Sequence, residues 1–216
     1  MSSFTTSRPA LWIVAGPNGS GKSTLYQNTD FETEGGSIWI INPDLLSARI
    51  ARIERLDAKR ANIEAVQRIE RWLEASIRAH QTIGVETVLS TGKYRRLVNA
   101  AKKLRFQINL IYVLLAAPEM HVERVRLRVE KGGHDVPMQK ILERRERSLR
   151  QLPWFLRQAD RAWLYDNSGA VPSLMGTKSK GIVTLDPSAL SEIKSAVNRI
   201  SSGRLSRSSP PPSARS

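Results

Sequence analysis

The segment at residues 16–24, which reads GPNGSGKST, constrains the fold of this chain more than any other feature. It follows the short apolar run at residues 10–16 and matches the spacing G-x-x-x-x-G-K-[ST]. Glycines at these positions let backbone N–H groups wrap around phosphate oxygens. The sequence therefore predicts a strand, a phosphate-binding loop and a helix in that order. A glycine-rich turn that binds nothing is the alternative, although such a turn needs neither the lysine nor the hydroxyl.

The polar residues of this loop have separate expected roles. Lys22 is expected to reach the β- and γ-phosphates of ATP, and the Ser23 hydroxyl is expected to bind Mg²⁺. Both Mg²⁺ and ATP are therefore predicted ligands. The residues expected to contact the nucleotide are Gly16, Pro17, Asn18, Gly19, Ser20, Gly21, Lys22, Ser23 and Thr24.

Further apolar runs alternate with helical patterns along the chain. The helical patterns include Ile63, Val66, Ile69, Leu73 and Ile77, which recur at steps of three and four. This alternation predicts an α/β fold of the P-loop NTPase type, a parallel sheet with helices on both faces and a helical lid. Residues 167–181 are interpreted as a surface loop before the last strand. The expected strands lie within residues 10–16, 37–41, 83–89, 106–116, 161–169 and 181–186.

Length and composition limit the domain organisation and the location. We expect a single kinase domain over residues 1–203, with a lid at about 118–150, and a disordered Ser/Pro/Arg tail at 204–216. Cysteine is absent, which excludes disulfides and thiolate metal sites. The sequence contains neither a membrane-spanning apolar run nor a signal-like start, so the cytoplasm is the expected compartment. A net charge of +14 favours polyanionic or phosphorylated partners. A solvated basic surface without such a partner is the alternative.

Acidic residues follow two of the expected strands. Asp44 comes after residues 37–41 at a helix start, where it could accept a proton from a substrate hydroxyl or only complement the helix dipole. Glu86 and Thr87 lie near the end of the strand at 83–89. A carboxylate in an otherwise buried strand requires a partner, which argues against an ordinary edge residue.

Two arginine-rich helical patterns flank Gly132 and Gly133. Two basic helices joined by a glycine turn suit a lid that closes over a transferred phosphoryl group, and a solvated helical hairpin is the alternative. Arg145 falls in an apolar stripe, so it is expected to need an anionic partner. No chemistry is assigned to His134. The arginines of the two patterns are Arg124, Arg126 and Arg128, and Arg144, Arg145 and Arg147.

The phosphate loop, the NPD and ET strand ends and the GGHDVP segment together resemble the zeta toxin family of P-loop kinases, especially its shorter members with a GGHxVP lid. The resemblance extends from about residue 11 to residue 167. It implies a kinase that uses Mg²⁺-ATP and, as in characterised toxins, phosphorylates UDP-N-acetylglucosamine.

Carried over by position, the resemblance implies that Asp44 is the general base and that Lys22 and Ser23 contact nucleotide and metal. It implies that Glu86 and Thr87 bind the substrate, and that Arg128 and Arg144 are lid arginines. One departure is Arg145, where the family pattern has an aromatic residue.

Three functions remain open at this point. The first is a kinase with a small-molecule alcohol acceptor, such as a nucleotide sugar. The second is a kinase that acts on a nucleic-acid end, which the net charge favours. The third is a P-loop ATPase switch with no phosphoryl acceptor. An antitoxin protein as a partner also remains open, because the residues themselves do not decide it.

Overall fold

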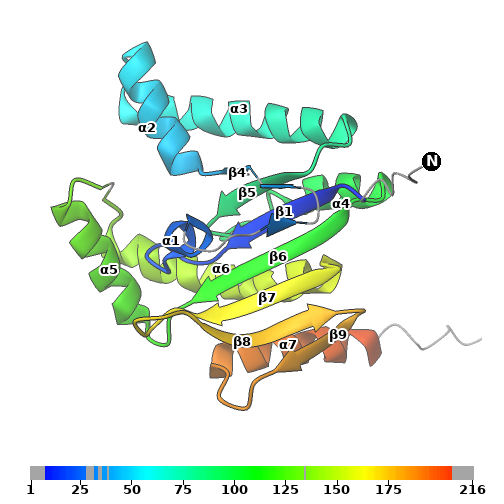
Figure 1. Ribbon diagram of the computed structural model, residues 1–216. Helices are drawn as coiled ribbons and strands as arrows, with labels where there is room; N and C mark the ends of the chain where they lie inside the picture. The colour runs from blue at the N-terminus through cyan, green and yellow to red at the C-terminus, as the bar shows by residue number, and fades with distance from the viewer. Residues whose placement is uncertain (1–7, 28–31, 34–35, 38, 134, 206–216) are drawn as a thin grey trace, which may run out of the picture.

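The computed structural model describes residues 8–27, 32–33, 36–37, 39–133 and 135–205. A seven-stranded sheet forms its centre, in the order β4-β5-β1-β6-β7-β8-β9 (Figure 1). The five strands from β4 to β7 run parallel, and β8 and β9 complete the sheet as an antiparallel edge. The predicted α/β P-loop fold class is confirmed.

The strands of the main sheet are short and agree largely with the apolar runs of the sequence. A separate small sheet pairs β2 (Glu32–Thr33) with β3 (Gly36–Ser37). The main sheet contains β1 (Ala10–Ala15), β4 (Ile40–Ile41), β5 (Ile83–Thr87), β6 (Gln107–Leu114), β7 (Arg161–Asp166), β8 (Ser173–Ser179) and β9 (Ile182–Leu185). The helices are α1 (Lys22–Gln27), α2 (Pro43–Glu54), α3 (Ala58–Arg78), α4 (Arg95–Lys103), α5 (Pro118–Glu130), α6 (Met138–Gln158) and α7 (Ser191–Leu205).

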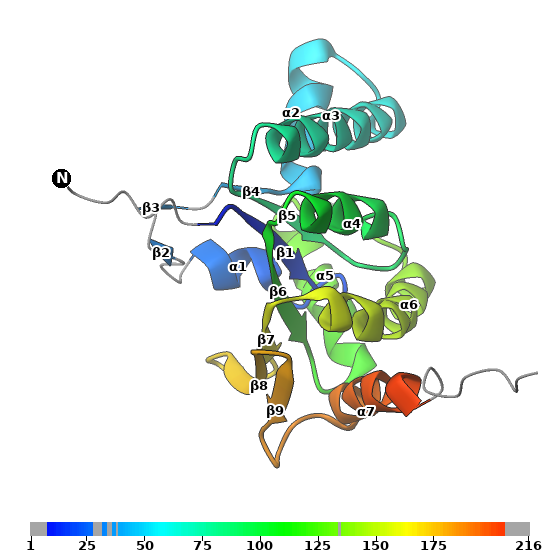
Figure 2. The same ribbon diagram turned by 90° about the vertical axis from the view of Figure 1, so that its right-hand side faces the viewer.

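The two faces of the sheet are covered unequally. Helices α4, α6 and α7 lie along one face, and α1 lies on the other (Figure 2). The larger apolar core fills the first face and includes Tyr112, Phe155 and Leu73. The smaller core packs Leu25 of α1 against Trp12 and its neighbours. The carboxyl ends of the five parallel strands lie on one side of the sheet, where α1 and α5 begin (Figure 1). Loop residues that follow several strands therefore meet on this side.

The expectation of one continuous strand at residues 37–41 was wrong. Among the described residues of this region, Ile40 and Ile41 pair with Gly84 and Val85 of β5 in the main sheet, while Ser37 pairs in the small sheet. Trp39 explains the shortening, because 71% of its surface is exposed and it packs edge-on against Trp72 instead of entering the core.

The interpretation of residues 167–181 as a loop was also wrong, because they contain β8. This strand is polar and lies next to the sheet edge, so its sequence lacks the apolar run of the central strands. Lys180 and Gly181 have φ of 49° and 80°, which is the two-residue type I′ turn that joins β8 to β9.

Two smaller points concern the helices and the chain end. In α3, the buried stripe is Ala61, Ala65, Ile69 and Leu73, while Ile63 is 49% exposed. The first half of α3 packs against α2, which rotates Ile63 outward. The predicted tail at 204–216 falls, from residue 206 on, outside the described residues.

Lys178 of β8 ties the edge of the sheet to the end of α6. Its ammonium is buried and donates to the carbonyls of Leu156, Arg157 and Ala159 at 2.8, 3.0 and 2.6 Å. These carbonyls belong to the last turn of α6 and the residue after it, where a helix has no further N–H groups to offer.

We expect Lys178→Met to lower the free energy of unfolding by about 3 kcal/mol, because it removes a charge and leaves three carbonyls, two of them in buried contacts, without this donor. Urea denaturation measures the change. Lys103→Met, at an exposed position of α4, is the matched control and should change stability by less than about 0.5 kcal/mol. Equal stabilities of the two variants would show that the Lys178 ammonium does not hold α6.

Candidate active site

The phosphate loop joins β1 to α1, as the sequence predicts, and its backbone is tightly packed. Gly16, Gly19 and Gly21 all have positive φ, at 149°, 74° and 84°. A Cβ atom at Gly19 would lie 2.6 Å from the backbone oxygen of His121 in α5, so no side chain fits there. The glycines therefore let the loop pack closely against α5, and Gly19 and Gly21 line a cavity together with Lys22.

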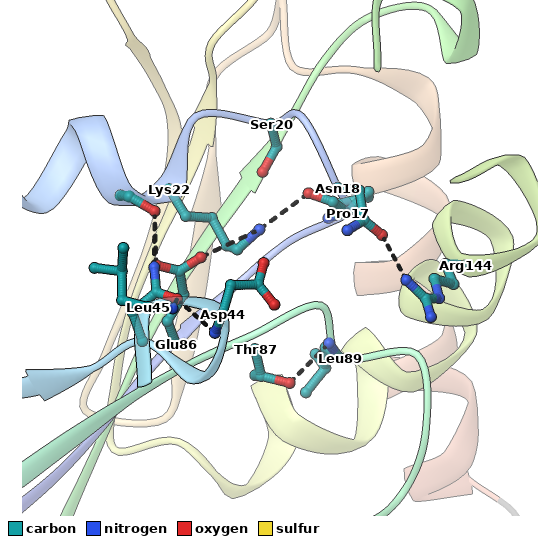
Figure 3. Close-up of polar contacts among 12 residues, drawn as sticks. Pro17, Asn18, Ser20, Lys22, Asp44, Leu45, Glu86, Thr87, Leu89 and Arg144 are labelled. Atoms are coloured by element: carbon teal, nitrogen blue, oxygen red, sulfur yellow. Dashed lines mark hydrogen bonds and ion pairs between the residues drawn. The ribbon is translucent and has the colours of Figure 1, made fainter. Parts of the chain in front are cut away.

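Lys22 is nearly buried at the start of α1, with 6% of its surface exposed. Its Nζ donates to the carbonyl oxygen of Pro17 at 3.0 Å and lies 3.8 Å from Oε1 of Glu86 (Figure 3). Burial lowers the pKa of Lys22 below its usual value, Glu86 and Asp44 act in the opposite direction, and Arg128 lowers it further. A cation in this position favours the binding of an anion such as a phosphate.

Glu86, at the end of β5, lies directly against the phosphate loop. Its Oε2 accepts hydrogen bonds from Ser23 Oγ and from Asn42 Nδ2, each at 2.8 Å. A hydroxyl and a carboxylate at this distance are the oxygen ligands that Mg²⁺ prefers. Within the described residues no group of three His, Cys, Asp or Glu side chains could hold a metal alone, so phosphate oxygens would have to complete the coordination of an ion here.

Asp44 and Thr87 occupy different environments. Asp44 is exposed in the first turn of α2 and lines the same cavity as Lys22. Thr87 Oγ1 accepts a hydrogen bond from the backbone N–H of Leu89 at 3.0 Å, and Leu89 has a φ of 59°. Among the described residues, the lining of the cavity includes Val88 but not Thr87. In this structure Thr87 stabilises the turn after β5.

The arginines of the two helices that flank Gly132 and Gly133 differ in their contacts. Arg128 lines the cavity, and Arg144 Nη1 reaches Asn18 Oδ1 at 3.5 Å, which is long for a hydrogen bond. Arg126 and Arg147 instead form exposed ion pairs with glutamates of their own helices. Arg124 also lines the cavity and donates to the carbonyl oxygen of Asn167 at 2.7 Å.

Arg145 has the anionic partner that its place in an apolar stripe requires. Its Nη2 lies 2.9 Å from Oε1 of Glu192 in α7, and its side chain is 6% exposed. On the same helix, Ser148 shares a hydrogen bond with Tyr112 of β6 at 3.0 Å. Helix α6 is thus fastened to the body of the protein, and Arg145 belongs to that attachment rather than to the cavity.

The cavity has a volume of about 690 Å³ and lies between the phosphate loop, the end of β5, helix α5 and the segment after β7. The basic residues of its lining, Lys22, Arg124, Arg128 and Lys131, outnumber the acidic ones, Asp44 and Glu86. The remaining lining residues are Asn18, Gly19, Gly21, Ser23, Thr24, Val88, Leu127, Gly132, Gly133, Asn167, Gly169 and Ala170. Its charge therefore favours a polyphosphate ligand.

Three residues that contribute to this site were missed in the sequence. Asn42 contacts Glu86 and Ser23, and Asn167 Nδ2 donates to the carbonyl oxygen of Ser20 at 2.8 Å. His121 is fully buried, and its Nδ1 donates to the carbonyl oxygen of Asn18 at 2.9 Å. Asn42 alone has a signal in the sequence, because an Asn before a Pro at a helix start is typical of an N-cap.

Burial lowers the pKa of His121 from 6.5 to about 4, against the effect of the Asn18 carbonyl and with a further lowering by Arg145, Lys22 and Arg124. The imidazole is therefore neutral at pH 7, with the proton on Nδ1. The native state binds a proton less readily than the unfolded state, so this group destabilises the fold as the pH falls from 6.5 to 4.

Between pH 6 and pH 5, His121 should lower the free energy of unfolding by about 1.4 kcal/mol per pH unit, because the unfolded state binds about one proton more than the native state. Urea denaturation at both pH values should give a smaller pH dependence for His121→Gln than for the parent. His80→Asn, which replaces an exposed histidine, is the control and should retain the parental slope. Parental slopes in both variants would contradict the buried, neutral state of His121.

No helix in the described part of the chain is long and apolar enough to cross a membrane.

In sequence, the chain is similar to an uncharacterized protein of Haemophilus influenzae (strain ATCC 51907 / DSM 11121 / KW20 / Rd). The two are 28% identical over 134 residues, which cover 59% of this chain and 91% of the relative.

Solved structures share the fold at low sequence identity. A chain in the AvrRxo1-ORF1:-ORF2 structure with ATP has a TM-score of 0.65 and 14% identity, and the match covers 97% of this chain but only 66% of that chain. A structure from the PezAT chromosomal toxin-antitoxin system of the human pathogen Streptococcus pneumoniae has a TM-score of 0.59 and 17% identity. Here the match covers 93% of this chain and 87% of that chain. Likeness at these identities establishes the fold.

A family model matches residues 11–152, from β1 through the phosphate loop and α5 into α6. This span holds all of the residues predicted for the site and most of the cavity lining. Since the matched residues make up more than half of the chain, the protein belongs to the AAA domain family.

Proposed function

We propose that this protein is a kinase of the zeta toxin type, which transfers the γ-phosphoryl group of Mg²⁺-ATP to a hydroxyl group of a small molecule. The observation that carries this proposal is the presence of Asp44 in the same cavity as Lys22, on a different element. In a kinase with an alcohol acceptor, a carboxylate outside the phosphate loop receives the proton of the acceptor hydroxyl, and the position of Asp44 suits that role.

The proposed reaction begins with the phosphates of ATP in the glycine loop, where backbone N–H groups and Lys22 bind them. Asp44 takes the proton from the acceptor hydroxyl as its oxygen bonds to the γ-phosphorus and the bond to the β-phosphate oxygen breaks. The products are a phosphate ester and ADP. Arg128, from the lid side, stabilises the charge on the phosphoryl group in transit.

Mg²⁺, when bound, neutralises charge on the β- and γ-phosphate oxygens. Ser23 and Glu86 are the residues that we propose to hold it, because their oxygens lie together beside the phosphate loop. The resemblance implied a substrate role for Glu86, and its contacts with Ser23 and Lys22 support the metal-side role instead.

The acceptor that we propose is a nucleotide sugar such as UDP-N-acetylglucosamine. This proposal rests on the resemblance to zeta toxins and on the excess of basic residues in the cavity lining, which suits a second phosphorylated ligand. The fold likeness to proteins from the PezAT toxin-antitoxin system and the AvrRxo1-ORF1:-ORF2 complex supports a partner protein as part of the same proposal.

A kinase for nucleic-acid ends is the second candidate, and the net charge of +14 favours it. Incubation with γ-labelled ATP, a panel of nucleotide sugars and a 5′-hydroxyl oligonucleotide separates the candidates. Label on a nucleotide sugar supports the first, and label on the oligonucleotide alone supports the second. Phosphate release that no acceptor changes would leave an ATPase switch and overturn both.

We expect Asp44→Asn to lower kcat for phosphoryl transfer by about 10²-fold to 10⁴-fold, because the amide cannot accept the acceptor's proton. The affinity for ATP should stay within about twofold of the parent, since the phosphate loop is unchanged. Steady-state kinetics and calorimetric titration with ATP measure the two effects. Asp57→Asn, at the N-cap of α3, is the matched control and should keep the parental rate. Transfer at the parental rate by folded Asp44→Asn would end the assignment of Asp44 as the base.

A further inference from the structure

Asn42 contacts two parts of the molecule through the two ends of one amide group. Its Oδ1 caps α2 by accepting hydrogen bonds from the backbone N–H groups of Asp44 and Leu45, at 2.9 and 3.2 Å. Its Nδ2 donates to Glu86 Oε2 at 2.8 Å and, more weakly, to Ser23 Oγ at 3.3 Å. The helix that carries Asp44 is therefore joined to the phosphate loop and to β5 by a single side chain.

The capping role explains half of these contacts. An N-cap needs an acceptor, and Ser, Asp or Asn supplies one about equally well. Serine has no second polar atom, and both oxygens of an aspartate carboxylate are acceptors, so only Asn adds the donor that here reaches Glu86. The Nδ2 contacts thus require a reason beyond the start of α2.

That reason lies in the two directions open to the Glu86 carboxylate. Its Oε2 is held by Asn42 and Ser23, while its Oε1 lies 3.8 Å from Lys22 Nζ. Hydrogen bonds that fix Oε2 keep the carboxylate beside the Ser23 hydroxyl. Without the amide, the carboxylate can rotate toward the ammonium of Lys22 and compete with a phosphate for it.

We propose that Asn42 is a positioning residue, which acts through Glu86. It holds the Glu86 carboxylate beside Ser23, and this leaves the ammonium of Lys22 available for phosphate. This inference rests on the proposed binding of Mg²⁺-ATP by the phosphate loop. It adds that the start of α2, and with it Asp44, is placed by the same group that orients the metal-side carboxylate. Binding of nucleotide and placement of the proposed base are then coupled through one residue.

The test uses Asn42→Ser and Asn42→Ala in the full chain, with the dissociation constant of ATP in the presence of Mg²⁺ measured by calorimetry. Serine keeps the helix cap but does not reach Glu86, whereas alanine removes both functions. We expect both variants to bind about tenfold more weakly than the parent, because a hydrogen bond to a charged group is lost in each. Asp57→Ser, which exchanges the cap of α3, is the control and should bind as the parent does.

The same change in a Glu86→Ala background shows whether Asn42 acts through Glu86. There, Asn42→Ser should cause no further loss of affinity, because its partner is gone. A merely structural role for Asn42 would give the same tenfold loss in both backgrounds. Unfolding midpoints measured by circular dichroism establish that each variant is folded at the temperature of the titration.

Parental affinity in Asn42→Ser would overturn the inference, because the cap alone would then account for the residue. An equal loss in both backgrounds would overturn it as well. These outcomes are independent of the acceptor. If the loss of ATP affinity in Asn42→Ser depends on Glu86 but the parent transfers no phosphoryl group, the role of Asn42 stands and the proposed kinase activity is overturned. If the parent transfers phosphoryl groups but Asn42→Ser binds ATP with the parental affinity, the reverse holds. A parent protein that does not bind Mg²⁺-ATP would overturn both proposals.

Discussion

The rest of the site depends on the contacts that the buried ammonium of Lys22 requires. A cation with 6% of its surface exposed has lost most of its water, so it needs oxygen atoms near it. The carbonyl of Pro17 and the carboxylate of Glu86 provide them, and Glu86 in turn is held by Ser23 and Asn42. The phosphate loop, the end of β5 and the start of α2 are therefore arranged around one charge.

The phosphate loop is also held by hydrogen bonds from α5 and from the segment after β7. Asn167, after β7, donates to Ser20, and His121 of α5 donates to Asn18. Helix α6 is fastened separately through Arg145 and Ser148. Of the two helices predicted to form the lid, α5 thus contacts the phosphate loop at its start, and its later residue Arg128 reaches the cavity. The lid at about residues 118–150 stays a prediction, and within it α6 is the helix fastened to β6 and α7.

The sequence predicted the centre of the fold well and its margins poorly. Strands β1 and β6 are buried almost throughout, β5 and β7 are partly buried, and all four read as apolar runs. The glycine spacing identified the phosphate loop. Strand β8 was missed because it is polar and antiparallel. The anionic partner expected for Arg145 was confirmed but could not be named from the sequence, because Glu192 lies 47 positions away in α7. Asn42 and His121 were missed for a related reason. Their contacts join residues 44 and 103 positions apart, which local patterns cannot reveal.

The central claim is that the charge of Lys22 is kept in this cavity for the phosphates of a nucleotide. Mg²⁺-ATP at a hundredfold excess over its dissociation constant should stabilise the parent by about 2.7 kcal/mol against thermal unfolding. Lys22→Ala should remove most of this stabilisation, and Lys103→Ala, at an exposed position of α4, should retain it. Equal stabilisation of the parent and Lys22→Ala would contradict the account, because the phosphates would then be bound without the lysine around which the site is arranged.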